Sequence, residues 1–129
     1  METVEAISAT EMSGPSILVV EDEPLIAMML EDFLDALGYR LAASCDGVGE
    51  ALAHVREGGF EAALLDVNLR DGETSWPVAD ALRESGCPFV IATGGSNDSV
   101  PERHAGAPVL SKPYTLDGVK EAFEALLSR

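Results

Sequence analysis

The sequence is poor in basic residues, and this shortage excludes several classes of partner. Eight lysine and arginine residues stand against 23 aspartate and glutamate residues, which gives a formal net charge of −15. No basic patch could then neutralise phosphates, so nucleic acid and anionic membranes are not expected as partners. The acidic balance fits a protein that binds cations or basic surfaces.

Long apolar runs and cysteine are scarce as well. No stretch approaches the ~20 apolar residues of a membrane-spanning helix, and the N-terminus lacks the regions of a signal peptide, so we expect a cytoplasmic protein. Cys45 and Cys87 have no metal-binding spacing, and we interpret both as buried small hydrophobes. Residues 1–15 are predicted to form a flexible leader, and residues 16–129 one domain.

Strand-like and helix-like segments alternate along this domain. The short apolar runs, which are typical of strands buried on both faces, are 16–20, 40–44, 62–65, 88–92 and 108–110. The segments with apolar residues at helical spacing are 24–37, 48–57, 75–85 and 116–127. Alternation with short connections predicts an α/β fold, with a doubly wound parallel sheet and helices on both faces.

Residues 94–107, GGSNDSVPERHAGA, interrupt this pattern between the fourth and fifth strands. They contain three glycines, one proline and almost no apolar stripe. A fourth helix there is expected to be short, at about 100–104, or disordered, and poorly anchored. We interpret His54 and His104 as solvated surface residues away from the strand ends.

Polar residues follow the predicted strands at their carboxyl ends, where an open parallel sheet collects its ligands. These residues are Glu21, Asp22, Asp66, Thr93 and Lys112. Each alone has a structural explanation as a cap, turn or surface residue, but together they predict a site. Hard oxygen ligands suit Mg²⁺, and a divalent cation would offset the repulsion between Glu21 and Asp22. Glu23 is expected in the first turn of the next helix, where the dipole favours acids.

Four stretches in this order carry a family resemblance: ILVVEDEP, LLDVNL, VIATGG and VLSKPY, beginning at residues 17, 64, 90 and 109. They resemble the receiver domain of two-component response regulators, and the resemblance covers about residues 16–128. It implies a flavodoxin-like fold, in which a five-stranded parallel sheet has the order 2-1-3-4-5 and flanking helices.

The resemblance also implies the roles of individual residues. Asp66 would accept a phosphoryl group from a sensor histidine kinase, Thr93 would hydrogen-bond that group, and Lys112 would pair with it. A cis Lys112-Pro113 peptide would aim the lysine into the site. The implied ligands of Mg²⁺ are Glu21, Asp22, Asp66 and the backbone carbonyl of Asn68. We therefore expect no enzyme beyond Mg²⁺-dependent self-phosphorylation and autodephosphorylation.

Some residues depart from the common receiver pattern. Glu21 stands where most receivers have aspartate, and Val109 where they commonly have the Tyr or Phe whose rotation reports phosphorylation. The stretch VNLRDGETSWPVADAL, residues 67–82, is similar to an alphaproteobacterial subgroup often paired with kinases of the HWE or HisKA2 type. We interpret Tyr114 as packing around the last helix.

The leading interpretation is a stand-alone, monomeric receiver that acts as a signalling switch or phosphate sink, since no output domain follows Arg129. A degenerate receiver that serves only protein binding is the alternative, and the intact Asp66, Thr93 and Lys112 oppose it. A phosphohydrolase of the haloacid dehalogenase type would need a second aspartate where Asn68 stands. A flavodoxin-type FMN carrier would need a phosphate loop rich in Ser, Thr and Gly after the first strand.

Overall fold

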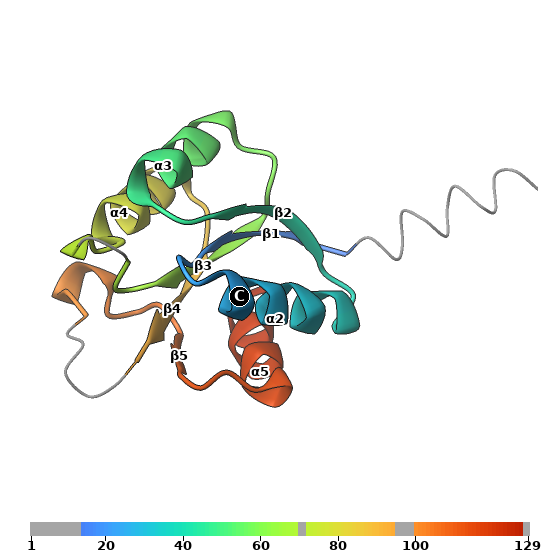
Figure 1. Cartoon of the computed structure of the whole chain (residues 1–129). Coiled ribbons are helices and arrows are strands. Elements are labelled where there is room, and N and C mark those ends of the chain that lie inside the picture. The colour runs from blue at the N-terminus through green and yellow to red at the C-terminus, as the bar shows by residue number, and fades with distance from the viewer. Residues whose placement is uncertain (1–13, 70–71, 95–99, 128–129) are drawn as a thin grey trace, which may run out of the picture.

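A computed structural model describes residues 14–69, 72–94 and 100–127 of the chain. Its centre is a five-stranded sheet in the order β2-β1-β3-β4-β5, in which neighbouring strands pair in parallel (Figure 1). The strands are β1 (Ser16–Val20), β2 (Arg40–Cys45), β3 (Ala62–Asp66), β4 (Phe89–Thr93) and β5 (Val109–Ser111). The predicted flavodoxin-like order is confirmed. The predicted leader lies almost wholly outside the described residues.

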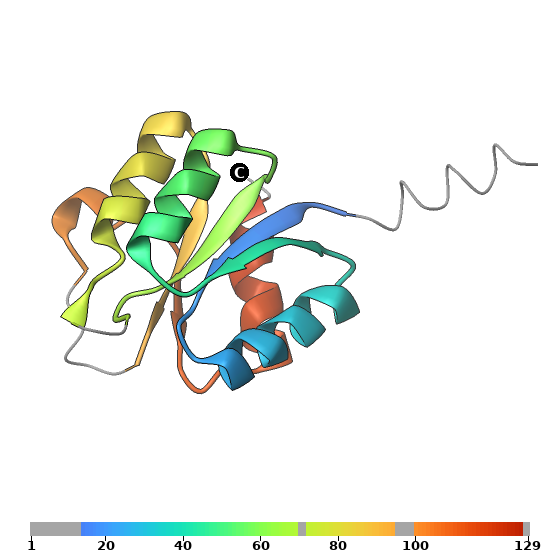
Figure 2. The same cartoon turned by 45° about the horizontal axis from the view of Figure 1, so that its top comes forward.

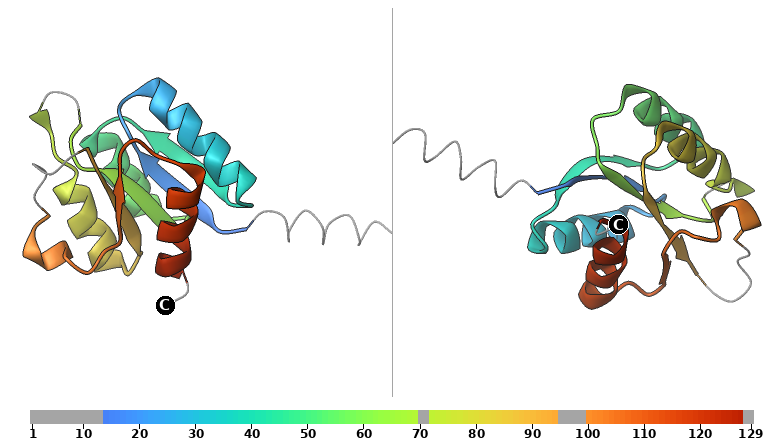
Figure 3. Two further views of the ribbon diagram at one scale, coloured as in Figure 1. Left: turned by 90° about the horizontal axis from the view of Figure 1, so that it is seen from below. Right: turned by 180° about the vertical axis from the view of Figure 1, so that it is seen from behind.

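Helices cover both faces of the sheet, as Figure 2 shows. They are α2 (Pro24–Ala36), α3 (Val48–Glu57), α4 (Trp76–Ser85) and α5 (Leu116–Leu127). α2 and α5 lie side by side on one face, and α3 and α4 on the other (Figure 3). None of the helices within the described ranges is long and apolar enough to cross a membrane.

Strand β1 shows why this sheet has two cores. Its side chains alternate between the faces, so Ile17 and Val19 pack under α2 and α5, while Leu18 and Val20 pack under α3 and α4. All four are at most 1% exposed. A strand buried on both faces must read as a continuous apolar run, which is why the sequence predicts it well.

The helix ends follow local signals, with one correction. α2 begins at Pro24, and Glu23 is its N-cap, one residue before the first turn in which we expected it. The Glu23 backbone N–H donates to Glu21 Oε2 at 3.1 Å, so the chain turns directly after β1. At α5 the Thr115 Oγ1 accepts from the Gly118 N–H at 3.0 Å, as a helix cap does.

The segment between β4 and β5 is anchored where described, contrary to the expectation for residues 100–104. It holds a 3₁₀ turn, η2 (Glu102–His104), and His104 is only 2% exposed, so its interpretation as a solvated residue is wrong. The His104 Nε2 lies 2.8 Å from Asp80 Oδ1, and its ring stacks on Trp76 with centroids 5.8 Å apart. Arg103 Nε donates to the same Asp80 oxygen at 2.8 Å. Hydrophobic periodicity misses this anchor because an ion pair and a ring stack form it.

The two cysteines are both free thiols. Cys45 is buried at the end of β2, as predicted, and Cys87 is half-buried, so the interpretation of Cys87 as a core residue holds only in part.

Replacing His104 should loosen the anchor between η2 and α4. We expect His104→Ala to lower the free energy of unfolding by about 2 kcal/mol, because the buried ring loses its contacts with Trp76 and Phe89. Urea denaturation measures this change, and amide exchange at residues 100–107 should become faster. Glu102→Ala, on the exposed side of the same turn, is the control. Equal stabilities of the two variants would contradict the anchor.

Candidate functional site

Three carboxylates meet at the carboxyl edge of the sheet. Glu21 follows β1, Asp66 ends β3, and these two strands are neighbours that pair through Val20 and Leu65. One oxygen from each of Glu21, Asp22 and Asp66 lies within 4.8 Å of the others. Glu21 and Asp66 are each 2% exposed, whereas Asp22 is half-buried. Strand order therefore assembles the predicted acidic group from residues 45 positions apart, since parallel strands end at one edge.

Lys112 supplies the positive charge of this edge. Its Nζ lies 2.9 Å from Asp66 Oδ2. The Lys112-Pro113 peptide is cis, as predicted, and the Lys112 backbone N–H donates to the Thr93 carbonyl at 2.9 Å. The loop after β5 is thus tied to the end of β4 while its lysine reaches across to β3.

Thr93 and Asn68 lie in the chain close to the ends of β4 and β3. Asp66 pairs with Ala92 in the sheet, so Thr93 stands one residue beyond that register position and is only 8% exposed. Asn68 is exposed in the loop after β3, where it forms an isolated backbone bridge with Thr74. The structure places both residues at the edge that the sequence predicts.

Tyr114 contributes a contact that the sequence analysis missed. It packs in the core beside Val119 and Phe123 of α5, which confirms the predicted packing. Its hydroxyl also donates to Glu21 Oε1, over a long 3.4 Å. Burial and the Glu21 charge raise the pKa of the phenol, so it stays a donor. A phenylalanine ring would be enough for packing at this position. The hydroxyl of Tyr114 was therefore the one feature of the sequence that could have predicted its contact with Glu21.

The pKa values of the cluster follow from burial and mutual repulsion. Burial, together with the charge of Asp66, raises the pKa of Glu21 to about 7. Burial also raises the pKa of Asp66, against the hydrogen bond and charge of Lys112. Burial lowers the pKa of Lys112, but Asp66 more than offsets this, so the net shift is upward and the ammonium is retained. The site therefore retains a carboxyl proton near neutral pH unless another cation replaces it.

The same residues fit a small divalent cation. Mg²⁺ is bound by one or two carboxylates together with waters and phosphate oxygens. Two buried carboxylates and a half-buried third, all within 4.8 Å, offer that donor set, and a cation would offset the repulsion between them. The fit rests on hard oxygen ligands alone, since this group contains neither sulfur nor imidazole.

Residues 17–124 match the response regulator receiver domain, and the chain belongs to this family of phosphoacceptors in two-component systems. The solution structure of SdrG from Sphingomonas melonis Fr1 is 59% identical, with a TM-score of 0.79, and the match covers 88% of this chain and 97% of that one. A BeF3-activated conformation of SdrG, recorded from Pseudomonas melonis Fr1, is 57% identical with a TM-score of 0.75, over 88% and 96% of the two chains.

Relatives with longer chains include the transcriptional regulatory protein PrrA of Mycobacterium tuberculosis. It is 32% identical over 127 residues, which are 93% of this chain and 53% of PrrA. The chain thus spans about half the length of the curated regulators that it matches.

The raised pKa of Glu21 makes the stability of the metal-free protein depend on pH. The pKa of this carboxyl is about 7 in the folded chain and 4.5 as the reference value, so the folded chain binds more protons between these limits. Protonation of Glu21 therefore stabilises the folded chain by at most about 3 kcal/mol. This stabilisation is complete below the reference pKa of 4.5 and is lost as pH rises through the folded pKa of about 7. Glu21→Gln lacks this dependence. Urea denaturation in EDTA measures this difference. The free energy of unfolding of Glu21→Gln, relative to that of the unaltered protein, should increase from about pH 5 to about pH 8.

Mg²⁺ should stabilise the folded protein most at the pH values where Glu21 has lost its proton. Because cation and proton compete for Glu21, millimolar Mg²⁺ should raise the melting temperature more at pH 8 than at pH 6. The rise should shrink in Glu21→Gln and persist in Glu57→Gln, an exposed acid at the end of α3. A Mg²⁺ effect that is equal in both variants would refute a metal role for Glu21.

Proposed function

We propose that this protein is a phosphoacceptor whose Asp66 takes a phosphoryl group from a sensor histidine kinase. The observation that carries the proposal is the buried Asp66 carboxylate, 2.9 Å from the Lys112 ammonium and grouped with two further carboxylates within 4.8 Å. Family membership supports it, and so does the BeF3-activated conformation of the similar SdrG. A receiver that served only as a binding module would have no need of a lysine paired with a buried aspartate.

The transfer forms a bond between an Asp66 carboxylate oxygen and phosphorus, while the bond from phosphorus to the kinase imidazole breaks and the imidazole keeps its electron pair. Lys112 neutralises Asp66 before transfer and can pair with a phosphoryl oxygen afterwards, since its side chain is 31% exposed and free to shift. Thr93 carries the hydroxyl proposed to hydrogen-bond that oxygen. Magnesium, when bound, supplies further charge neutralisation; its proposed ligands are Glu21, Asp22, Asp66 and the Asn68 carbonyl.

We propose that output does not pass through an aromatic gate in β5. Val109 occupies the position at which receivers commonly carry an aromatic residue, and it is 52% exposed. A branched aliphatic side chain cannot report phosphorylation by the rotation of a ring. The movement of Thr93 would instead be passed directly to residues 94–99, of which 95–99 lie outside the described residues. The chain from Val100 onward is anchored on α4 through His104.

The kinase is proposed to be of the HWE or HisKA2 type. Support comes from the stretch at residues 67–82, which is similar to receivers paired with such kinases. We further propose that the protein acts as a cytoplasmic monomer.

Removal of the proposed acceptor should abolish phosphorylation. Asp66→Ala incubated with acetyl phosphate and Mg²⁺ should show no phosphoryl adduct by intact mass, and no chemical-shift changes with beryllofluoride. Asp32→Ala, an exposed acid on α2, should behave as the unaltered protein does. A phosphoryl adduct that persists in Asp66→Ala would place the acceptor elsewhere.

A phosphate sink requires a short-lived phosphoprotein, and Asn68 is proposed to keep it so. Its amide, two residues after Asp66 and exposed, can hydrogen-bond a water that attacks in line with the phosphorus. Asn68→Met should lengthen the half-life by about tenfold, equivalent to about 1.4 kcal/mol in the barrier. Gly95, for which we propose the same control of water, lies outside the described residues.

The test is the decay of the phosphorylated protein after the kinase has been removed, with Mg²⁺ present. A half-life of minutes or less for the unaltered chain would support the sink. A half-life of many hours would favour a long-lived switch and exclude the sink.

A further inference from the structure

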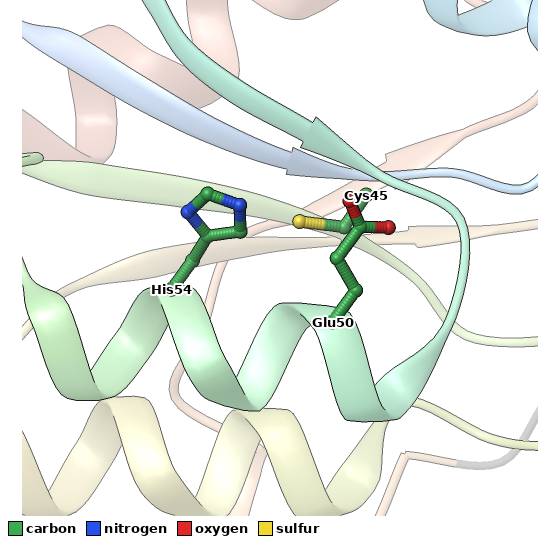
Figure 4. A group of neighbouring side chains, drawn as sticks. All are labelled: Cys45, Glu50 and His54. Atoms are coloured by element: carbon green, nitrogen blue, oxygen red, sulfur yellow. The ribbon is translucent and has the colours of Figure 1, made fainter.

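A second group of metal-ligating side chains lies beside the acidic site. Cys45 ends β2, and Glu50 and His54 lie four residues apart on α3, hence on one face of that helix. One ligand atom from each lies within 4.8 Å of the others. Figure 4 shows the Cys45 thiol directed toward the His54 ring, with the Glu50 carboxylate beside the cysteine.

These side chains are available to a ligand. Within the described ranges we find no hydrogen bond of the Cys45 thiol or the His54 ring, and Cys45 is only 1% exposed. Glu50 Oε1 accepts only a long hydrogen bond, at 3.4 Å, from the Asp46 backbone N–H. Cys45 is buried at the bottom of this group. His54 is half-buried, so its interpretation as a solvated residue holds only in part, and the exposed Glu50 can rotate to admit an ion.

We infer that Cys45, Glu50 and His54 form a binding site for a divalent transition metal, with Zn²⁺ as the best match. Thiolate, imidazole and carboxylate are each zinc ligands, and three protein ligands leave a fourth position for water. Zinc bond lengths imply that ligand atoms lie about 3.5 Å apart, so a small contraction of the group suffices. Mg²⁺, which binds oxygen almost exclusively, is not expected to compete.

The surrounding charges favour a cation over a free thiolate. Burial, with the charges of Glu50 and Asp46, raises the pKa of the Cys45 thiol to about 11, so without metal the sulfur stays protonated and unreactive. The same carboxylates attract a divalent cation, which deprotonates the thiol on binding. Binding should therefore release about one proton and weaken as pH falls.

The inferred zinc site adjoins the acidic site without sharing its ligands. The Glu21 backbone N–H donates to the Cys45 carbonyl at 2.9 Å. Glu21, Asp22, Cys45 and Glu50 also line one shallow cavity of about 230 Å³. The inference does not depend on the proposed phosphorylation, because its ligands and its test are separate.

The test is a titration of the full chain, treated with EDTA and reduced, with Co²⁺ as a spectroscopic substitute for Zn²⁺. We expect a thiolate-to-cobalt charge-transfer band that saturates at one equivalent, is quenched by Zn²⁺, and survives excess Mg²⁺. His54→Ala should weaken Co²⁺ binding by about tenfold or more, since even the loss of a residue that only orients a ligand costs that much. Cys45→Ser should abolish the band.

Two controls keep the result specific. Cys87→Ser removes the other thiol and His104→Gln the other imidazole, and both variants should bind Co²⁺ as the unaltered chain does. Because Cys45 is buried and its variant could misfold, the half-buried His54 gives the deciding variant. No charge-transfer band in the unaltered chain, or a band that His54→Ala leaves unchanged, would overturn the inference.

Discussion

The carboxyl edge of the sheet depends on the burial of two carboxylates, Glu21 and Asp66. Each is 2% exposed, and a pair of like charges in such a place is stable only when a proton or cations compensate it. Lys112, 2.9 Å from Asp66, supplies one compensating charge, while burial and the charge of Asp66 still raise the pKa of Glu21. This remaining negative charge is why we propose that the site takes a cation and, with it, a phosphoryl group.

The η2 turn gives a different kind of order to the segment between β4 and β5. A surface helix is usually held by an apolar stripe, and this segment has almost none. Here Asp80 holds the segment instead, because Arg103 Nε and His104 Nε2 each lie 2.8 Å from its Oδ1. The exposed part of this anchor, the Arg103–Asp80 ion pair, can separate at low cost, since water can solvate both charges.

Ligand chemistry separates the two cation sites at neighbouring strand ends. The carboxylates around Asp66 offer only hard oxygen, whereas Cys45 and His54 add sulfur and nitrogen. The hydrogen bond from the Glu21 backbone N–H to the Cys45 carbonyl links the two sites. A metal at either site would therefore restrain the turn that carries a ligand of the other.

Local sequence patterns were sufficient to predict the strands, the helix start at Pro24, the helix cap at Thr115, and the set of residues from Glu21 to Lys112 at one edge. They sufficed because buried parallel strands are continuous apolar runs whose ends share an edge. Contacts between distant elements were not predictable in this way. Burial of His104 against Trp76, the Tyr114 hydroxyl on Glu21, and the approach of His54 to Cys45 depend on how elements pack. No periodicity records such contacts, because each depends on the distance between side chains from separate elements, which arises only when the chain folds.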